Sequence, residues 1–515
     1  MRRIVLRWLL PTAALVGMIF FLTEGSSLIA GRPFQLGSYS SVQFVLNTNA
    51  AALASTLGIL MAIVLLMVQL TAQRYSFNII GMFVHNPRNV ALVIVFIITI
   101  VFNLWLAASI DESYVPQLGT YVALMLGTVC FGLLLPYFAY LFEILTPQML
   151  LNRLQRDAIA AVDAARRGRA VPPARRRAAE TVLHIGDITR TSCSLGDAEV
   201  ARHSIWILYG TFCRYLERKP DLPPDWFTVE DRFFRGRHAL IVKEIEESGT
   251  WLERRLFEEF QSAFTGSLNR LEPVNTTVAL CCRLSGEQAL ERGDEGALRL
   301  LIKFFNTFLR AALNARDARA GYHLLYQYAL LADAAFESRP DLAIEIAHRI
   351  AYYGETAIAM GVMWVAIAAA QDLRSLAEAS VRRGLPRETT AHLHEELLDM
   401  LAVAERKKEL RGSPTMNLLQ KTVLALGAYH LDSGDEELAR ELARGLRTAY
   451  PSHLARLARD LEAVTEPQFW ELTDRAVNFE YLEEGPRGRL ADFVAIAAAD
   501  SSRDEDSLEA LEVAD

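Results

Sequence analysis

The chain has 515 residues, of which 52% are hydrophobic, and its formal net charge is -8. This hydrophobic fraction lies slightly above that of soluble globular proteins, because the apolar excess is confined to the N-terminal third. The five cysteines include no CxxC pair, which excludes a disulfide framework and a cysteine-based zinc site and suits a reducing cytoplasm.

Four apolar stretches dominate residues 1–150, each near the roughly 20 residues that cross a hydrocarbon core. They run over residues 6–22, 50–70, 90–110 and 121–145, and they predict a four-helix transmembrane domain. The first stretch follows Met-Arg-Arg and is also compatible with a secretory signal. We favour an uncleaved helix, because no clear cleavage site follows it and three further stretches do.

The arginines predict the orientation of these spans. Arginines precede the first span, lie between the second and third, and follow the fourth, whereas the other two connections are poor in positive charge. Since positively charged connections stay on the cytoplasmic side, we expect both termini and the whole region after residue 150 to be cytoplasmic.

The second and third spans contain no ionisable residue between residues 50 and 73 or between 89 and 110, which argues against a proton relay or coupled transporter. Gln69, Asn103 and Thr128 are the candidate intramembrane polar contacts. We favour hydrogen bonds between helices over pore lining for these three side chains. Ala50, Ala54 and Gly58 recur at four-residue spacing and predict close helix packing.

The segment between the second and third spans predicts a short helix lying in the membrane interface, because Phe77, Ile80, Phe83 and Val84 share one helical face. His85 stands alone there, which favours an exposed side chain over a metal ligand or pH sensor.

This block resembles a bacterial family of predicted multi-pass membrane proteins, domain-of-unknown-function family 2254. The resemblance rests on a long apolar helix that runs into the sequence Val-Gln-Leu-Thr-Ala-Gln-Arg-Tyr-Ser at residues 68–76, followed by a short apolar segment, a polar break and another span. The resemblance implies a bacterial inner-membrane protein of unassigned activity and supplies no catalytic residues.

Residues 151–177 predict a juxtamembrane helix and a linker rich in arginine and proline. Each arginine near an anionic leaflet contributes on the order of 1 kcal/mol, so we expect contact with anionic lipid headgroups. A solvated linker is the second interpretation, and nucleic-acid binding is disfavoured because no aromatic residues are interleaved. The arginines are Arg166, Arg167, Arg169, Arg175, Arg176 and Arg177.

Residues 178–499 predict a cytoplasmic all-helical domain, so the fold class of the whole chain is all-α. Apolar residues recur at three- and four-residue steps between Gly and Pro breaks, which is typical of paired antiparallel helices. Residues 424–451 look like one tetratricopeptide unit, with Gly434 turning the chain, and a similar pair is expected around residues 342–370. No fixed period of 34 residues emerges, so we expect an irregular helical repeat or bundle. Residues 500–515 form an acidic tail.

Catalytic signatures are absent from the sequence, so we expect no enzyme, no catalytic, cofactor-binding or metal-binding residue and no cofactor. There is no phosphate-binding glycine loop, GxSxG or HExxH motif. His392 and His394 are two residues apart, which places them on different sides of a helix, and we expect a solvated face. Gly286, Gly293 and Gly296 read as breaks between helices.

Two functions remain, with the lipid bilayer as one partner of either. The first is a membrane-tethered interaction or scaffold protein whose helical domain binds another protein. The alternative is an oligomeric ion channel with a helical cytoplasmic vestibule or gate. Gln69 and Asn103 discriminate between them: alignment on a symmetry axis of a homo-oligomer favours the channel, and packing within one subunit favours the anchor.

Overall fold

The computed structural model describes residues 38–74, 87–112, 114–144, 146–168, 170–228, 238–469, 475 and 477–499, with the backbone alone at residues 70–74, 87, 88 and 142–144. The chain divides into two compact units, Met1–Arg153 and Leu154–Asp515. The described residues are helical almost throughout and contain isolated β-bridges but no strand, as expected for an all-α protein.

The N-terminal unit contains three described helices that are long and apolar enough to cross a membrane. They are α2 (Tyr39–Arg74), α4 (Pro87–Ala108) and α5 (Gln117–Ile144), with apolar spans Tyr39–Gln69, Asn89–Ala108 and Gln117–Leu141. Three of the four predicted spans are thus found among the described residues, and the first, at residues 6–22, lies outside them. The predicted interfacial helix also lies largely outside them.

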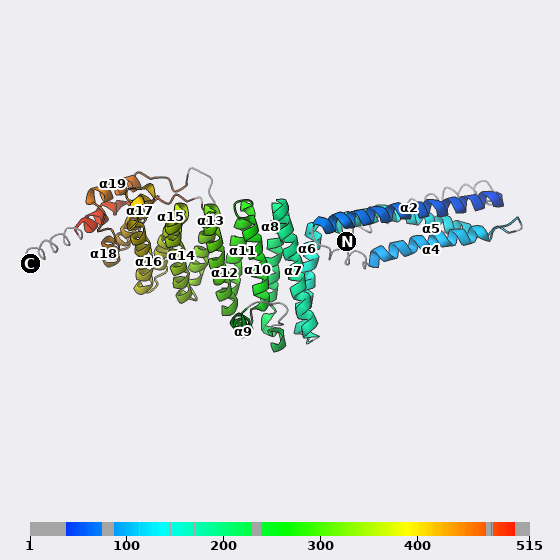
Figure 1. Cartoon of the computed structure of the whole chain (residues 1–515), viewed down its shortest axis with the longest axis horizontal. Coiled ribbons are helices and arrows are strands. Elements are labelled where there is room, and N and C mark those ends of the chain that lie inside the picture. The colour runs from blue at the N-terminus through cyan, green and yellow to red at the C-terminus, as the bar shows by residue number, and fades with distance from the viewer. Residues whose placement is uncertain are drawn as a thin grey trace, which may run out of the picture. The chain divides into compact units, whose positions relative to one another are not determined.

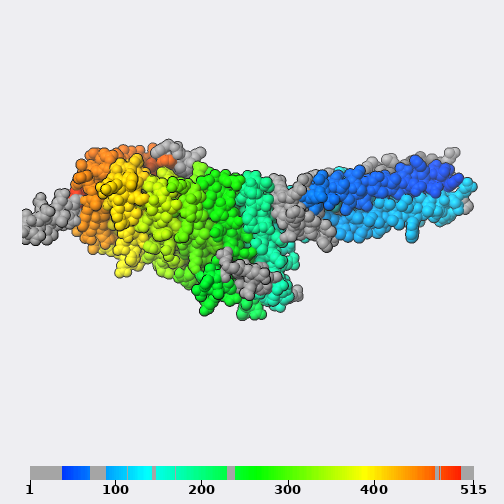
Figure 2. Space-filling view, in the orientation of Figure 1, coloured from blue at the N-terminus to red at the C-terminus, as the bar shows by residue number. Residues whose placement is uncertain are grey.

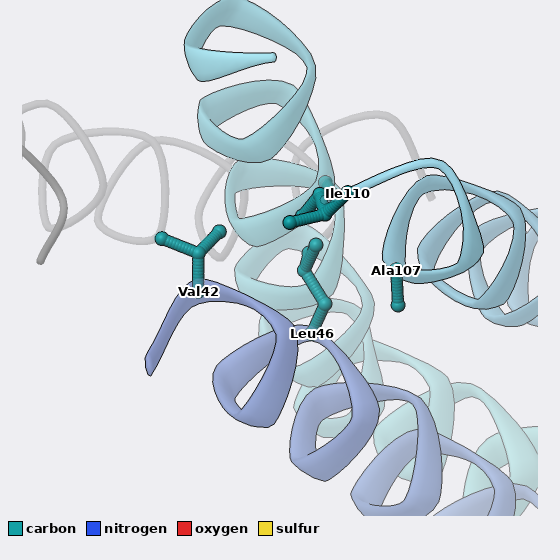
Figure 3. Close-up of a cluster of buried hydrophobic side chains, with 5 residues drawn as sticks. Val42, Leu46, Ala107 and Ile110 are labelled. Atoms are coloured by element: carbon teal, nitrogen blue, oxygen red, sulfur yellow. The ribbon is translucent and has the colours of Figure 1, made fainter. Parts of the chain in front are cut away.

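Helix α2 begins at Tyr39, ahead of the predicted start at Ala50. The polar residues 47–49 concealed this extension in the sequence. Val42 and Leu46 on the extra turns are buried against Ala107 near the end of α4, Ile110 just after it and Ala123 on α5. Figure 3 labels these residues except Ala123. Burial of this apolar surface compensates for polar neighbours that would otherwise end the span.

The C-terminal unit is an array of antiparallel helices, which Figure 1 shows as one row. α6 (Pro147–Arg166) enters it at Leu154. The others are α7 (Val171–Leu195), α8 (Ala198–Leu216), α9 (Ala239–Ser248), α10 (Trp251–Ser267), α11 (Glu272–Glu291), α12 (Glu295–Asn314), α13 (Ala318–Ala335), α14 (Pro340–Met360), α15 (Met363–Arg382), α16 (Arg387–Glu405), α17 (Pro414–Asp432), α18 (Glu436–Arg444), α19 (Pro451–Glu462) and α20 (Glu484–Gly488), with short 3-10 turns at Lys219–Asp221, Pro224–Trp226 and Lys408–Leu410.

The array has two layers. Helices α7, α10, α12, α14 and α16 form the first layer, and α8, α11, α13, α15 and α17 form the second layer. Each helix packs on its neighbours in its own layer and in the other, so every apolar stripe is covered on more than one side. Figure 2 shows the successive helices as adjoining bands from green to orange.

Glycine and aspartate make the tight turns between several paired helices. Gly293 and Gly434 have positive φ angles of 65° and 83°, a conformation that glycine adopts at little cost. The following Asp294 and Asp435 each accept a hydrogen bond from the backbone N–H three residues on, which caps the next helix. The break expected at Gly293 and the turn expected at Gly434 are therefore confirmed, whereas the breaks expected at Gly286 and Gly296 are wrong, because these residues lie within α11 and α12.

The two helix pairs expected from the sequence are present. Residues 424–451 include the C-terminal half of α17 and all of α18, although α17 begins earlier, at Pro414. Residues 342–370 fall on α14 and α15. The structure thus supports an irregular helical repeat.

The expected linker after α6 is a short turn instead. α6 ends at Arg166 and α7 begins at Val171, so only a few residues separate the two helices. Pro172 and Pro173 lie in the first turn of α7, where a backbone N–H has no partner within the helix. The Pro-Pro pair that suggested a break therefore starts a helix.

An irregular segment interrupts the helices after α19. We call residues 463–469, 475 and 477–483 the arm. Gln468 and Val477 form an antiparallel bridge, and the Asn478 N–H donates to the Pro467 carbonyl at 3.0 Å. The chain then enters α20 and the last described helix, Leu490–Ala499. Phe493 packs against Gly427 of α17 so closely that a Cβ there would lie 2.1 Å from its ring.

Candidate functional site

A cavity of about 580 Å³ lies where the arm crosses helices α13, α15 and α17 of the second layer. Its walls combine aromatic, acidic and basic side chains that come from all three helices and from the arm. We call this feature the groove. Its lining includes Tyr326, Gln371, Asp372, Arg374, Arg382, Tyr429 and Arg475.

Arg475 of the arm is buried at the end of the groove. Its guanidinium donates to both oxygens of Asp372 on α15, at 2.6 and 3.1 Å, and to the Tyr322 carbonyl on α13 at 2.9 Å. Both side chains of the ion pair are about 95% buried, with exposed fractions of 4% and 5%. Burial raises the pKa of Asp372, and the positive charge of Arg475 opposes that rise.

Aromatic rings surround the guanidinium. Its central carbon lies 4.2 Å from the ring centre of Tyr322 and 4.9 Å from that of Tyr326, within the range of cation–π attraction. Phe479 of the arm packs near Tyr322 and the half-exposed Trp364. A carboxylate, a backbone carbonyl and ring faces together form a site selective for a planar cation.

Polar side chains of the second layer bind the rest of the arm. Arg374 donates to the Phe479 carbonyl at 3.2 Å, and Lys421 on α17 pairs with Glu480 at 3.0 Å. Arg374 also pairs with Glu378 at 2.7 Å. Contacts to main chain and to side chains of one segment are what an array of paired helices offers to an extended peptide.

Sequence reasoning missed the groove. Asp372 carried a usable signal, since it follows the apolar run 365–370 of α15 and a charge in such a run needs a partner. The partner lies 103 residues away in a segment without periodicity, and no local pattern identifies it.

The predicted polar contacts of the spans differ in placement. Asn103 on α4 is fully buried and accepts a hydrogen bond from the Asn49 side chain of α2 at 2.9 Å, so two helices of one chain share it. Thr128 is partly buried and donates to the Leu124 carbonyl of its own helix at 2.9 Å. Gln69 is exposed. Asn49, which the sequence interpretation left outside the second span, is the partner that it missed.

Breaking the asparagine pair should destabilise the N-terminal unit. Asn103→Leu leaves the Asn49 amide without its acceptor in an apolar bundle, and we expect a loss of about 1 kcal/mol. The measurement is unfolding of the full chain in mixed micelles with increasing sodium dodecyl sulfate. Thr128→Val is the control, since its hydroxyl bonds only within α5. An equal loss in both variants would contradict a specific role for the pair.

The small residues predicted to pack helices are divided in the structure. Ala50 is buried, whereas Ala54 and Gly58 are exposed, and no described residue lies within 4 Å of a Cβ added at Gly58. Close approaches between the described spans occur instead at Gly119 and Gly127 on α5, where an added Cβ would lie 2.9 Å from the Leu106 side chain and 2.7 Å from that of Asn49. A packing role for Ala54 and Gly58 stays a prediction.

The arginines expected at a lipid surface also separate into groups. Arg175 is buried, and its guanidinium donates to the carbonyls of Asp225, at 2.8 Å, and Thr228, so it holds a loop inside the helical unit. Arg169 lies outside the described residues. Contact with lipid headgroups stays a prediction for the exposed arginines, which are Arg166, Arg167, Arg176 and Arg177.

The expectation of a solvated face is wrong for His394. His392 is exposed, but His394 on α16 is buried, and its Nε2 lies 2.8 Å from Nε2 of His430 on α17. Burial lowers the pKa of His394 to about 3 and that of His430 to about 4. Across the described residues, no three His, Cys, Asp or Glu side chains group as metal ligands would.

Among comparisons with known proteins, the family match covers only the N-terminal part of the chain. No curated protein matches it. A solved circular tandem repeat protein with novel repeat topology and enhanced subunit contact surfaces is 17% identical, with 93% of this chain and 99% of that chain covered and a TM-score of 0.29.

Residues 5–189 match the family model described as "Predicted membrane protein (DUF2254)". This match confirms the resemblance found at residues 68–76 and extends it through the first spans and into α7. Over residues 5–189 the chain is therefore similar to the DUF2254 family of predicted membrane proteins.

Proposed function

We propose that the protein is a membrane-tethered interaction protein of the bacterial inner membrane, with a helical array in the cytoplasm that binds another protein. The groove over α13, α15 and α17 carries this proposal. It combines a cavity of about 580 Å³ with aromatic rings, a buried carboxylate and charged edges, a combination suited to holding a peptide segment. Asp372 is neutralised by Arg475, so the geometry supports binding rather than catalysis.

The pairing of Asn49 with Asn103 supports the anchor over the channel. The amide of Asn103 is buried between α2 and α4 of one chain, where it is unavailable to line a pore on a symmetry axis. The distribution of arginine around the spans supports a cytoplasmic position for the array.

The proposal is tested by site-specific photo-crosslinking of the full-length protein in its native membranes. A photoreactive amino acid at Ser375, which is exposed in the groove, should give a discrete adduct with a second protein. The same amino acid at Glu395, exposed on α16 in the first layer, is the matched control and should give none. Absence of an adduct at Ser375, or equal adducts at both positions, would overturn the proposed function.

The channel is tested separately with the purified protein in lipid vesicles. We expect no ion flux under voltage or membrane tension. Reproducible conductance that Asn103→Leu alters would replace the anchor with the channel. A reporter fused after Asp515 should be active only in the cytoplasm, and its export would overturn the topology.

A further inference from the structure

The arm packs on the helices of the array as a bound peptide would, and several of its residues form one wall of the groove. Arg475 reaches partners that lie 103 and 153 residues away in the chain, and no helix of the array depends on it for continuity. Its guanidinium supplies the cation that the buried carboxylate of Asp372 requires. The helices thus form the receptor, and the arm supplies the side chain that fills it.

The arm leaves part of the groove open. Beside the ion pair, the cavity of about 580 Å³ is bordered by exposed or half-exposed side chains, including Ser375, Arg382 and Tyr429. In the groove, the Phe479 carbonyl of the arm accepts a hydrogen bond from Arg374, and outside the groove lining Glu480 pairs with Lys421. Another extended segment can accept the hydrogen bond of Arg374 equally well, because the acceptor is a backbone carbonyl.

The chemistry of the groove selects one class of occupant. The helices of the groove contribute one more acidic than basic side chain to its lining, which favours a cation over phosphate and nucleic acid; these side chains are Asp333, Asp372, Glu378, Arg374 and Arg382. The rings of Tyr322 and Tyr326 favour a planar guanidinium over an ammonium. In the arm, the aromatic ring that packs beside Trp364 is that of Phe479, which lies four residues after Arg475. An occupant with the same spacing can place an arginine and an aromatic ring at these two positions.

We propose that the groove binds a partner protein through a segment that carries an arginine and, four residues later, an aromatic residue, and that this segment displaces the arm. The inference rests on the proposed function and names the partner chemistry and its regulation. The arm acts as an internal competitor, so the array presents its binding site only when the arm has left it.

The test uses the full-length protein in detergent and a fluorescent peptide with the sequence of residues 464–483. Arg475→Ala removes the anchor of the arm, so the peptide should bind this variant at least about tenfold more tightly than wild type, because a tethered competitor has an effective concentration in the millimolar range. A peptide with alanine in place of its arginine should not bind. The double variant Asp372→Asn with Arg475→Ala should lose this gain in peptide affinity, because the buried carboxylate that binds the arginine is gone.

Arg475→Lys is a second variant that keeps a cation over Asp372 if the alanine variant fails to fold. Lysine lacks the two-pronged geometry of the guanidinium, so we expect peptide affinity between those of wild type and Arg475→Ala. Equal binding of the arginine and alanine peptides would overturn the inference, as would the absence of binding to a folded variant. Crosslinking at Ser375 that persists in that case would leave the proposed function intact.

Discussion

Lys219→Met is expected to destabilise the helical unit by about 3–5 kcal/mol, because it leaves a buried carboxylate without its cation. The Lys219 ammonium lies 2.6 Å from Glu253 and 2.6 Å from Asp294. Glu253, in the first turn of α10, is fully buried. Asp294 also caps α12, so this lysine joins the 3-10 turn after α8 to the starts of two further helices.

The pH dependence of the stability loss in Lys219→Met tests whether the unpaired Glu253 carboxylate causes that loss. Burial raises the pKa of Glu253, and Lys219 lowers it, so removal of the lysine should raise that pKa further. A carboxyl with a raised pKa in the folded state costs stability above its unfolded pKa and none once it is protonated in both states. The loss should therefore shrink as the pH falls toward 4.

Chemical denaturation of the full-length protein in detergent, followed by circular dichroism, measures the loss. Lys303→Met is the matched control, because its ion pair with Glu244 lies on the surface and surface pairs contribute little. A loss in Lys219→Met no larger than in this control would show that the buried cluster does not stabilise the array.

The histidine pair should make the array sensitive to acid. The folded-state pKa values of His394 and His430, about 3 and about 4, lie below the usual 6.5. The folded state therefore binds fewer protons, and stability is complete above pH 6.5 and falls as the pH drops toward 4. Between pH 7 and pH 5 we expect a loss of about 4 kcal/mol for the two groups.

The double variant His394→Leu with His430→Leu tests this prediction, since it removes both titrating groups and fills the space with apolar side chains. Its thermal midpoint should change less between pH 7 and pH 5 than that of wild type. The exposed His392→Leu is the control and should keep the full acid sensitivity. The prediction fails if the double variant loses as much stability at pH 5 as wild type does.

Local patterns in the sequence predict most of the secondary structure. The apolar stretches predict the spans, and the three- and four-residue steps predict paired helices with turns such as Gly434 and Asp435. These features depend on residues within one or two helical turns of each other, so local sequence patterns are enough to predict them. Two helix boundaries differ from the prediction. α2 begins before the polar residues 47–49, because packing buries the apolar residues ahead of them, and α7 includes Pro172 and Pro173, because the first turn of a helix tolerates proline.

The groove and the buried polar pairs could not be predicted in the same way. Asn49 finds Asn103, His394 finds His430, and Asp372 finds Arg475 across separations of 54, 36 and 103 residues. Each pairing depends on the rotation and register of two helices, or on the course of the arm, and many registers satisfy the same apolar periodicity.

By itself, the sequence determined that this chain has helices long and apolar enough to cross a membrane and a large helical domain, because the length and periodicity of apolar runs separate candidate spans from amphipathic helices. Only the tertiary structure decided which polar side chains are buried together and where the array is open to a partner. The physical reason is that a buried polar group is stable only beside a matching group, and that match is made between distant parts of the chain.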